Sequence, residues 1–161
     1  MRKKLSVVFG LGLLAFALHA LGKSKGFAFP AGYREWIHVK SAVLGPQFPS
    51  FETEGGFHHI YANKEARQGL KSGQFPDGSI LVYDLLSATE QGGVVSEAAR
   101  RRVDVMYKDE KQYPESGGWR FQRFMGDDQS KDVLTEEHRA ACFSCHQSQK
   151  RHDFVFSEFR P

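Results

Sequence analysis

The sequence predicts an α+β fold in which an antiparallel sheet of about five strands packs against two or more helices. The length of 161 residues allows one ordinary domain, and the content of 40% apolar and 25% charged residues is that of a globular protein. Several short stretches alternate apolar and polar residues with a period of two, as strands do. The connections between these stretches are short, which favours antiparallel pairing.

The first half of the chain is predicted to contain two strands and one helix. Apolar residues at alternate positions indicate a strand over residues 37–43 and a second, shorter one over 57–61. A helix is expected over residues 64–71. Asn63 is a suitable N-cap for this helix, and Gly73 provides its stop.

The second half is predicted to contain three strands and a last helix. Residues 75–78, Phe-Pro-Asp-Gly, predict a turn, because Pro fixes one φ angle and Gly accepts a positive one. Strands are expected over 79–86, 102–107 and 119–125. Thr135 is expected to cap the helix that follows it, which leads directly into the two cysteines. Five strands and two helices do not make a helical bundle.

The N-terminus has the features of a secretory signal. Three basic residues precede an uncharged, largely apolar run over residues 5–18, and small residues follow where a signal peptidase cuts. We therefore expect a signal peptide over residues 1–22, a periplasmic location and one domain over residues 23–161. The run is shorter than the ~20 residues that span a bilayer, so a membrane anchor is expected only if the signal stays uncleaved.

Removing this signal changes how the net charge of +3 is interpreted. Residues 1–22 hold three of the 22 basic residues and none of the 19 acidic ones, so the remainder has 19 of each. The excess positive charge belongs to the export signal. We therefore expect no nucleic-acid partner, because such binding needs a basic surface.

The two cysteines of the chain lie in residues 142–146, Cys-Phe-Ser-Cys-His, which form a C-x-x-C-H motif. Two thiols at this spacing on one helical turn can add to the two vinyl groups of a haem, and the adjacent imidazole then binds the iron. A thioredoxin-like redox pair would follow a βαβ unit, and a zinc site would need more ligands. We therefore expect a covalent haem c held by Cys142, Cys145 and His146, with His146 as the iron ligand.

The other side of the iron is predicted to be open. Electron-transfer cytochromes close it with a Met from downstream, but no Met follows the motif, and Met106 and Met125 lie in predicted strands, where packing is the commoner role. Histidine is the alternative sixth ligand, and five are available: His38, His58, His59, His138 and His152. Neighbouring strand residues point to opposite faces, so one of His58 and His59 should point inward.

Four segments occur in a characteristic order along the chain. They are Gly-Tyr-Arg-Glu-Trp at 32–36, Phe-Pro-Asp-Gly at 75–78, Gly-Trp-Arg-Phe at 118–121, and the motif at 142–146 followed by Asp-Phe-Val-Phe at 153–156. Together they resemble the cytochrome P-460 and cytochrome c'-beta family over nearly the whole mature chain. The resemblance implies a β-rich, often homodimeric periplasmic cytochrome with a five-coordinate haem. It also implies hydroxylamine oxidation, as in P-460 members, or nitric oxide binding, as in c'-beta members.

One departure from the family pattern concerns the haem cross-link. P-460 enzymes carry a lysine on the strand after the Phe-x-Asp-Gly turn that bonds to the haem, and Tyr83 stands at that position here. Tyr83 is predicted either to pack beside the porphyrin or to act as a pocket phenol that donates to a bound ligand or reacts with the haem. Lys71, on the preceding helix, is the alternative cross-linking residue. The missing lysine moves the interpretation from hydroxylamine oxidation toward nitric oxide binding.

Asp104 is the second candidate catalytic residue that the resemblance implies. P-460 enzymes place a carboxylate over the haem on the strand before a Lys-Asp step, and Asp104 precedes the step at residues 108–109. In an apolar pocket, desolvation would raise the pKa of this carboxyl and let it accept a proton from a bound substrate. The alternative is a surface aspartate paired with Arg101 or Arg102.

The remaining predictions concern the walls of the haem pocket and its partners. Phe57 and Phe75 are expected to line an apolar distal wall, which excludes water and favours neutral diatomic ligands. Three cations near the motif could contact the imidazole or a haem propionate: Lys150, Arg151 and Arg160. The expected ligands are nitric oxide, hydroxylamine and peroxide, with another cytochrome as redox partner and a possible homodimer. The competing hypothesis is an electron carrier with a six-coordinate haem.

Overall fold

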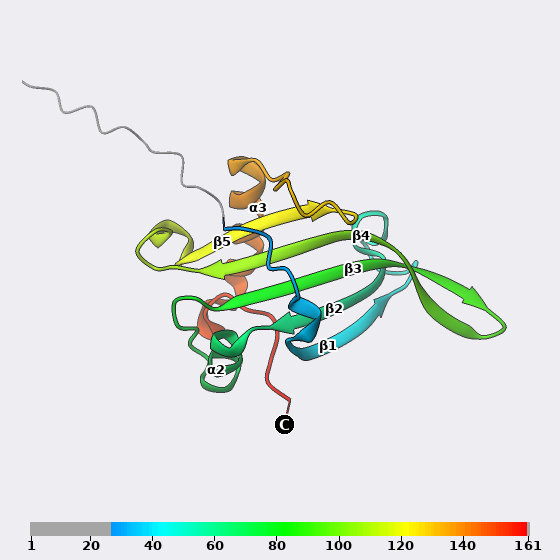
Figure 1. Cartoon of the computed structure of the whole chain (residues 1–161), viewed down its shortest axis with the longest axis horizontal. Coiled ribbons are helices and arrows are strands. Elements are labelled where there is room, and N and C mark those ends of the chain that lie inside the picture. Colours follow the sequence, from blue (N-terminus) through cyan, green and yellow to red (C-terminus); the bar gives the residue numbers. More distant parts are fainter. Residues whose placement is uncertain (1–26, 161) are drawn as a thin grey trace, which may run out of the picture.

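A computed structural model describes residues 27–160, so the predicted signal peptide over residues 1–22 lies outside the described residues. In this part of the chain, five strands form one sheet in the order β1-β2-β3-β4-β5, and every neighbouring pair is antiparallel (Figure 1). The predicted α+β fold with a five-stranded antiparallel sheet is therefore confirmed. Within residues 27–160, no helix is both long enough and apolar enough to cross a lipid bilayer.

The predicted strands and the two predicted helices occur in the predicted order, and one further short helix, α1, precedes β2. The strands are β1 (Ile37–Leu44), β2 (Gly56–Ala62), β3 (Ile80–Gln91), β4 (Val94–Lys108) and β5 (Trp119–Met125). The α-helices are α1 (Phe51–Glu54), α2 (Lys64–Ser72) and α3 (Glu136–His146). Three short 3-10 helices complete the fold, namely η1 (Tyr33–Glu35), η2 (Pro114–Ser116) and η3 (Gln147–His152).

Strands β3 and β4 are longer than the sequence predicts. They continue as a hairpin past the ends of the other strands, and this hairpin projects from one side of the molecule (Figure 1). Gly92 and Gly93 form its tip with φ angles of 60° and 80°, which glycine adopts without strain. Side chains near the tip are exposed on both faces, so the sequence there lacks the alternation that marks a half-buried strand.

The caps of the two longer helices confirm the predicted boundaries. The Asn63 side chain accepts a hydrogen bond from the Ala66 amide at 2.9 Å, and Gly73 ends α2 with a φ of 79°. The Thr135 hydroxyl accepts from the His138 amide at 3.2 Å and begins α3.

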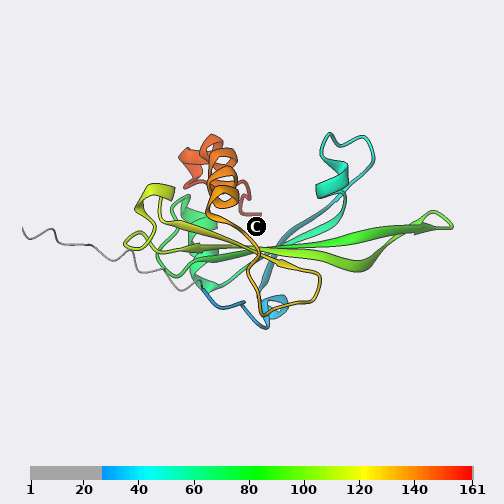
Figure 2. The same cartoon turned by 90° about the horizontal axis from the view of Figure 1, so that it is seen from above.

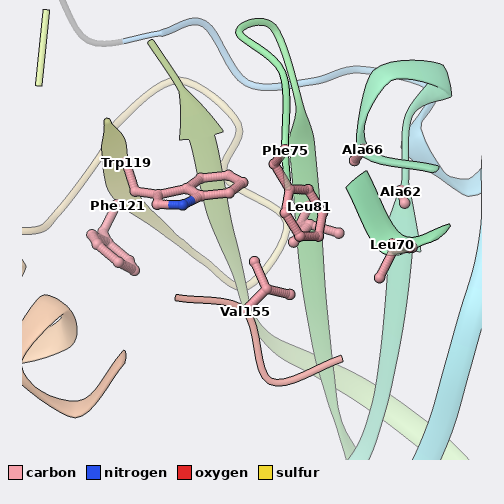
Figure 3. Packing of buried hydrophobic residues seen from close by; sticks show 8 residues of the cluster. All are labelled: Ala62, Ala66, Leu70, Phe75, Leu81, Trp119, Phe121 and Val155. Carbon is pink, nitrogen blue, oxygen red and sulfur yellow. The ribbon is translucent and has the colours of Figure 1, made fainter. Parts of the chain in front are cut away.

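The sheet buries an apolar cluster on each of its two faces. Helices α1 and α3 lie on one side of the sheet, and η1 lies on the other (Figure 2). The cluster on the α3 side, which we call the first cluster, joins the sheet to α2 and to the C-terminal segment (Figure 3): Ala62, Ala66, Leu70, Phe75, Leu81, Trp119, Phe121 and Val155. The second cluster lies under η1: Tyr33, Ile80, Val82, Val103, Val105 and Phe124.

Candidate haem-binding site

The C-x-x-C-H motif occupies the last five residues of α3, Cys142 to His146. Cys142 is half-buried and packs against the first cluster, whereas Cys145 is exposed at the helix surface. Neither cysteine forms a disulfide, and burial raises the pKa of the Cys142 thiol. Both thiols are therefore present as groups that could react with a haem vinyl group.

The imidazole of His146 is held in one orientation and one tautomer. Its Nδ1 lies 2.7 Å from the backbone oxygen of Phe154, and because a carbonyl only accepts, Nδ1 carries the proton. Burial lowers the pKa of His146, so the ring is neutral at pH 7. The rings of Phe121 and Phe156 each lie 5.0 Å from it. The Nε2 lone pair is thus available to a metal.

This donor set fits the group that the motif predicts. A neutral imidazole with its second nitrogen bonded to a carbonyl is the usual form of a histidine metal ligand, and two thiols lie within one turn of it. Within residues 27–160, no group of three His, Cys, Asp or Glu side chains could hold a metal ion. One neutral imidazole and two thiols on one helix are the groups that would hold an iron porphyrin.

Asp104 lies on the same sheet face as the first cluster, in a row of charges rather than among apolar groups. Its Oδ2 lies 2.8 Å from Nε of Arg102, and its Oδ1 lies 2.5 Å from Nε of Arg123. The pairing with Arg102 is the alternative that the sequence left open. Arg101, the other expected partner, instead donates to the backbone oxygens of Glu52 and Gly55.

Tyr83 lies next to Asp104 in the register of the sheet and forms part of this polar region. Its ring stacks on His58 at 5.0 Å, and the guanidinium of Arg102 lies 5.7 Å from the ring centre. Burial and the nearby charge of Glu54 raise the pKa of Tyr83 to about 12. The phenol is therefore protonated at neutral pH and can donate a hydrogen bond.

His58 is the histidine of β2 that faces the first cluster. It is 9% exposed, burial lowers its pKa, and its Nδ1 has no hydrogen-bond partner among the described residues. The adjacent His59 points to the opposite face, where its Nε2 lies 2.6 Å from Glu97. The expectation that one of these two histidines points inward is met by His58.

The structure does not bring the two expected wall residues together. Phe75 is buried in the first cluster, with its ring 5.5 Å from that of Trp119 (Figure 3). Phe57 lies on the opposite sheet face, where it stacks on His59, because neighbouring strand residues alternate between faces. Lys71 is exposed at the end of α2, with its Nζ over the ring of Phe159.

The sequence does not predict some features of the site, and several of its candidate residues are exposed on the surface. The sequence does not predict α1, which is only four residues long, and so misses the place of Glu54 2.5 Å from Arg102. It also misses the Phe154 carbonyl, since a backbone group leaves no signal in the sequence. Several residues considered from the sequence are exposed: His38, His138, Lys150, Arg151, His152 and Arg160.

Comparison with known protein families adds the decisive observation. The model of the family described as Cytochrome P460 matches residues 30–157, which include the whole sheet, α3 and the Phe154 carbonyl. The chain belongs to the cytochrome P460 family. This confirms the resemblance that the four sequence segments indicate, and the family implies a haem cofactor. A search among curated proteins found no match for this cytochrome P460 protein.

Proposed function

We propose that this protein is an exported c-type cytochrome that binds nitric oxide at an open iron site, with slow oxidation of hydroxylamine or reduction of peroxide. The observation that carries the proposal is the imidazole of His146, neutral and fixed through Nδ1, in the same helix as two thiols. Cys142 and Cys145 would hold the porphyrin through thioether bonds, and Nε2 of His146 would bind the iron. The bound haem supplies an iron centre that takes small ligands and exchanges electrons.

The polar residues on the α3 side of the sheet favour binding over turnover. Both oxygens of Asp104 accept hydrogen bonds from guanidinium groups, so this carboxylate would have to give them up before it could take a proton from a ligand. By the family resemblance, Tyr83 stands at the position of the cross-linking lysine. Its neutral hydroxyl makes only a long hydrogen bond, 3.5 Å to Glu54, and could donate to a bound ligand instead. These two features support nitric oxide binding as the main activity.

A visible spectrum of the holoprotein, made in a host that matures c-type cytochromes, tests the proposal. We expect a high-spin ferric haem that takes up nitric oxide, and an intact mass equal to the mature chain from residue 23 plus one haem. The Cys142→Ala and Cys145→Ala variants should each weaken covalent attachment. A colourless periplasmic product, or haem that dissociates fully on denaturation, contradicts the proposal.

Electron transfer by a six-coordinate haem is the second candidate function, and one observation favours it. Within residues 27–160, the buried Nδ1 of His58 has no hydrogen-bond partner, and it lies on the same sheet face as Asp104 and Tyr83. A low-spin spectrum in the wild type that becomes high-spin in His58→Ala would establish this alternative. A high-spin spectrum in both proteins would exclude it.

The role of Asp104 is tested by separating turnover from binding. If Asp104 moves protons, Asp104→Asn should lower hydroxylamine turnover with an artificial oxidant at least tenfold while nitric oxide affinity changes little. Asn keeps the size of the side chain and can still accept from Arg102 or Arg123. An equal loss of turnover and of affinity would assign Asp104 to pocket structure alone.

We extend the proposal to the location and partners of the protein. Export to the periplasm would place it among other cytochromes, one of which would exchange electrons with it, and a homodimer is the proposed assembly. Cell fractionation and N-terminal sequencing of the mature protein test the export. Sedimentation of the holoprotein tests the dimer, and a single species at the monomer mass would contradict it.

A further inference from the structure

A buried ion pair includes Asp153, the residue immediately before Phe154, whose carbonyl holds His146. Lys108, at the end of β4, is 1% exposed, and its Nζ lies 2.8 Å and 3.0 Å from the two carboxylate oxygens of Asp153. The same Nζ donates to the Gly117 oxygen at 2.8 Å and lies 5.3 Å from the centre of the Trp119 ring. A lysine this deeply buried is rare unless it is paired, so the pair has a specific place in the fold.

Asp153 ties the segment after the haem motif to three other parts of the chain. Its carboxylate accepts from Lys108 and, at 2.9 Å, from the amide of Phe75 in the Phe-Pro-Asp-Gly turn. Its backbone oxygen accepts from Nε1 of Trp119, the first residue of β5, at 2.8 Å. Asp153 is thus fixed through both its side chain and its backbone.

The backbone at this point has an unusual conformation that these contacts maintain. Asp153 and Phe154 have φ angles of 51° and 66°, and they are the only described residues other than glycine with a positive φ. Such a conformation is costly for a residue with a side chain and persists where the surroundings enforce it. Its effect is to direct the Phe154 carbonyl toward Nδ1 of His146, 2.7 Å away.

We propose that Lys108, Asp153 and Trp119 are positioning residues that set the orientation and donor strength of the His146 imidazole. They act through the Phe154 carbonyl and do not touch the ligand themselves. A firm Nδ1–H···O bond makes an imidazole a stronger electron donor, and this favours the ferric over the ferrous iron. The inference rests on the proposed binding of iron by His146. It adds that these three residues help to set the reduction potential of that iron.

The test measures the reduction potential and the iron–histidine stretching band of the ferrous holoprotein in three variants. Lys108→Met removes the cation, and Asp153→Asn removes the charge but can still accept from Phe75. Trp119→Phe removes the indole donor and part of the ring beside Lys108 but keeps one aromatic ring. We expect the potential to rise and the stretching band to move to lower frequency in each, least in Trp119→Phe. Trp119→Phe preserves an aromatic ring in the first cluster, so it serves as the test if either charge variant fails to fold.

Asp84→Asn is the matched control for the loss of a buried charge. Asp84 is 0% exposed and is held by Tyr33, Arg34 and Arg100 on the opposite face of the sheet. This variant should lose stability while the potential and the stretching band stay at wild-type values. If the reduction potential and the stretching band are the same in all variants, control included, this inference is wrong but the proposed function is not affected. A wild-type protein without covalent haem, or one whose iron spectrum is unchanged in His146→Ala, would refute the proposed function and the inference with it.

Discussion

The two sides of the sheet each contain a buried carboxylate held by cations, yet the two carboxylates serve different segments. Asp84 lies within β3 and accepts from the Tyr33 hydroxyl at 2.7 Å and from Arg34 and Arg100 at 2.8 Å each. It joins η1, near the beginning of the described chain, to the long hairpin. Asp153 lies in an irregular segment and joins the end of α3 to the sheet.

This difference separates a stabilising network from one that also orients a ligand. Asp84 is in regular strand backbone, so its hydrogen bonds hold η1 and β4 to β3 through side chains and do not determine where a backbone carbonyl points. Asp153 is in left-handed backbone next to Phe154, so the same kind of ion pair also determines where a carbonyl points. A buried charge therefore affects the candidate haem site only where the backbone beside it is part of that site.

The largest expected effect is the loss of Asp84. Asp84→Ala leaves the Tyr33 hydroxyl and the guanidinium groups of Arg34 and Arg100 without this buried partner. The Arg34 side chain is 45% exposed and Arg100 keeps its pair with Asp127, so the free energy of unfolding should fall by about 3 kcal/mol, the lower end for a buried pair, as measured by urea denaturation of the holoprotein. Glu158→Ala, at an exposed site, is the control and should change stability by less than about 0.5 kcal/mol. A loss of similar size in both variants would remove Asp84 from the comparison as a stabilising centre.

The pH dependence of stability gives a second readout for Asp84. Burial alone would raise its pKa, but hydrogen bonds from Arg100, Tyr33 and Arg34 lower it below the ordinary value. The stabilisation is therefore present above pH ~4 and is lost as the pH falls through the lowered pKa. The wild type should lose this part of its stability in acid, whereas Asp84→Ala should lack it at every pH.

The two helix caps on the α3 side should differ in cost. Asn63 accepts from the amides of Ala66 and Ile80 and donates to the Gly78 oxygen, so Asn63→Ala should lower the free energy of unfolding by about 2 kcal/mol. Thr135 makes one cap bond, and Thr135→Ala should cost about 1 kcal/mol. Thermal unfolding of both variants measures the difference. Equal losses would mean that the bonds from Asn63 to Ile80 and Gly78 add nothing.

The smallest expected effect concerns the titration of two buried tyrosines, Tyr33 and Tyr83, one on each side of the sheet. Burial, with the nearby Asp84, raises the pKa of Tyr33 to about 12, and burial with Glu54 does the same for Tyr83. A raised pKa stabilises the fold below pH ~10, and this contribution falls between pH 10 and 12. Alkaline titration of the tyrosine absorbance should show one fewer late-titrating group in each of Tyr33→Phe and Tyr83→Phe. Titration of either tyrosine near pH 10 would contradict its burial.

The sequence predicts those parts of the fold that depend on local patterns. Asn63 and Thr135 cap their helices through amides three residues away, so the boundaries of α2 and α3 are readable from short stretches. The ends of β3 and β4 are not, because the exposed hairpin tip lacks alternation. Phe57, expected to line the distal wall of the haem pocket, lies on the opposite sheet face for a related reason. One step along a strand reverses the face, and the sequence does not tell which face receives α3.

In the candidate site, too, some features follow from local sequence and others only from the tertiary structure. The spacing within residues 142–146 predicts two thiols and an imidazole on one helix, because residues three and four apart share a helical face. Only the tertiary structure brings Lys108 against Asp153, 45 positions later, and pairs Asp104 with Arg123 across two strands. These contacts depend on strand register and on how the segment after α3 packs. Both result from the burial of distant apolar residues together, which no local pattern of residues records.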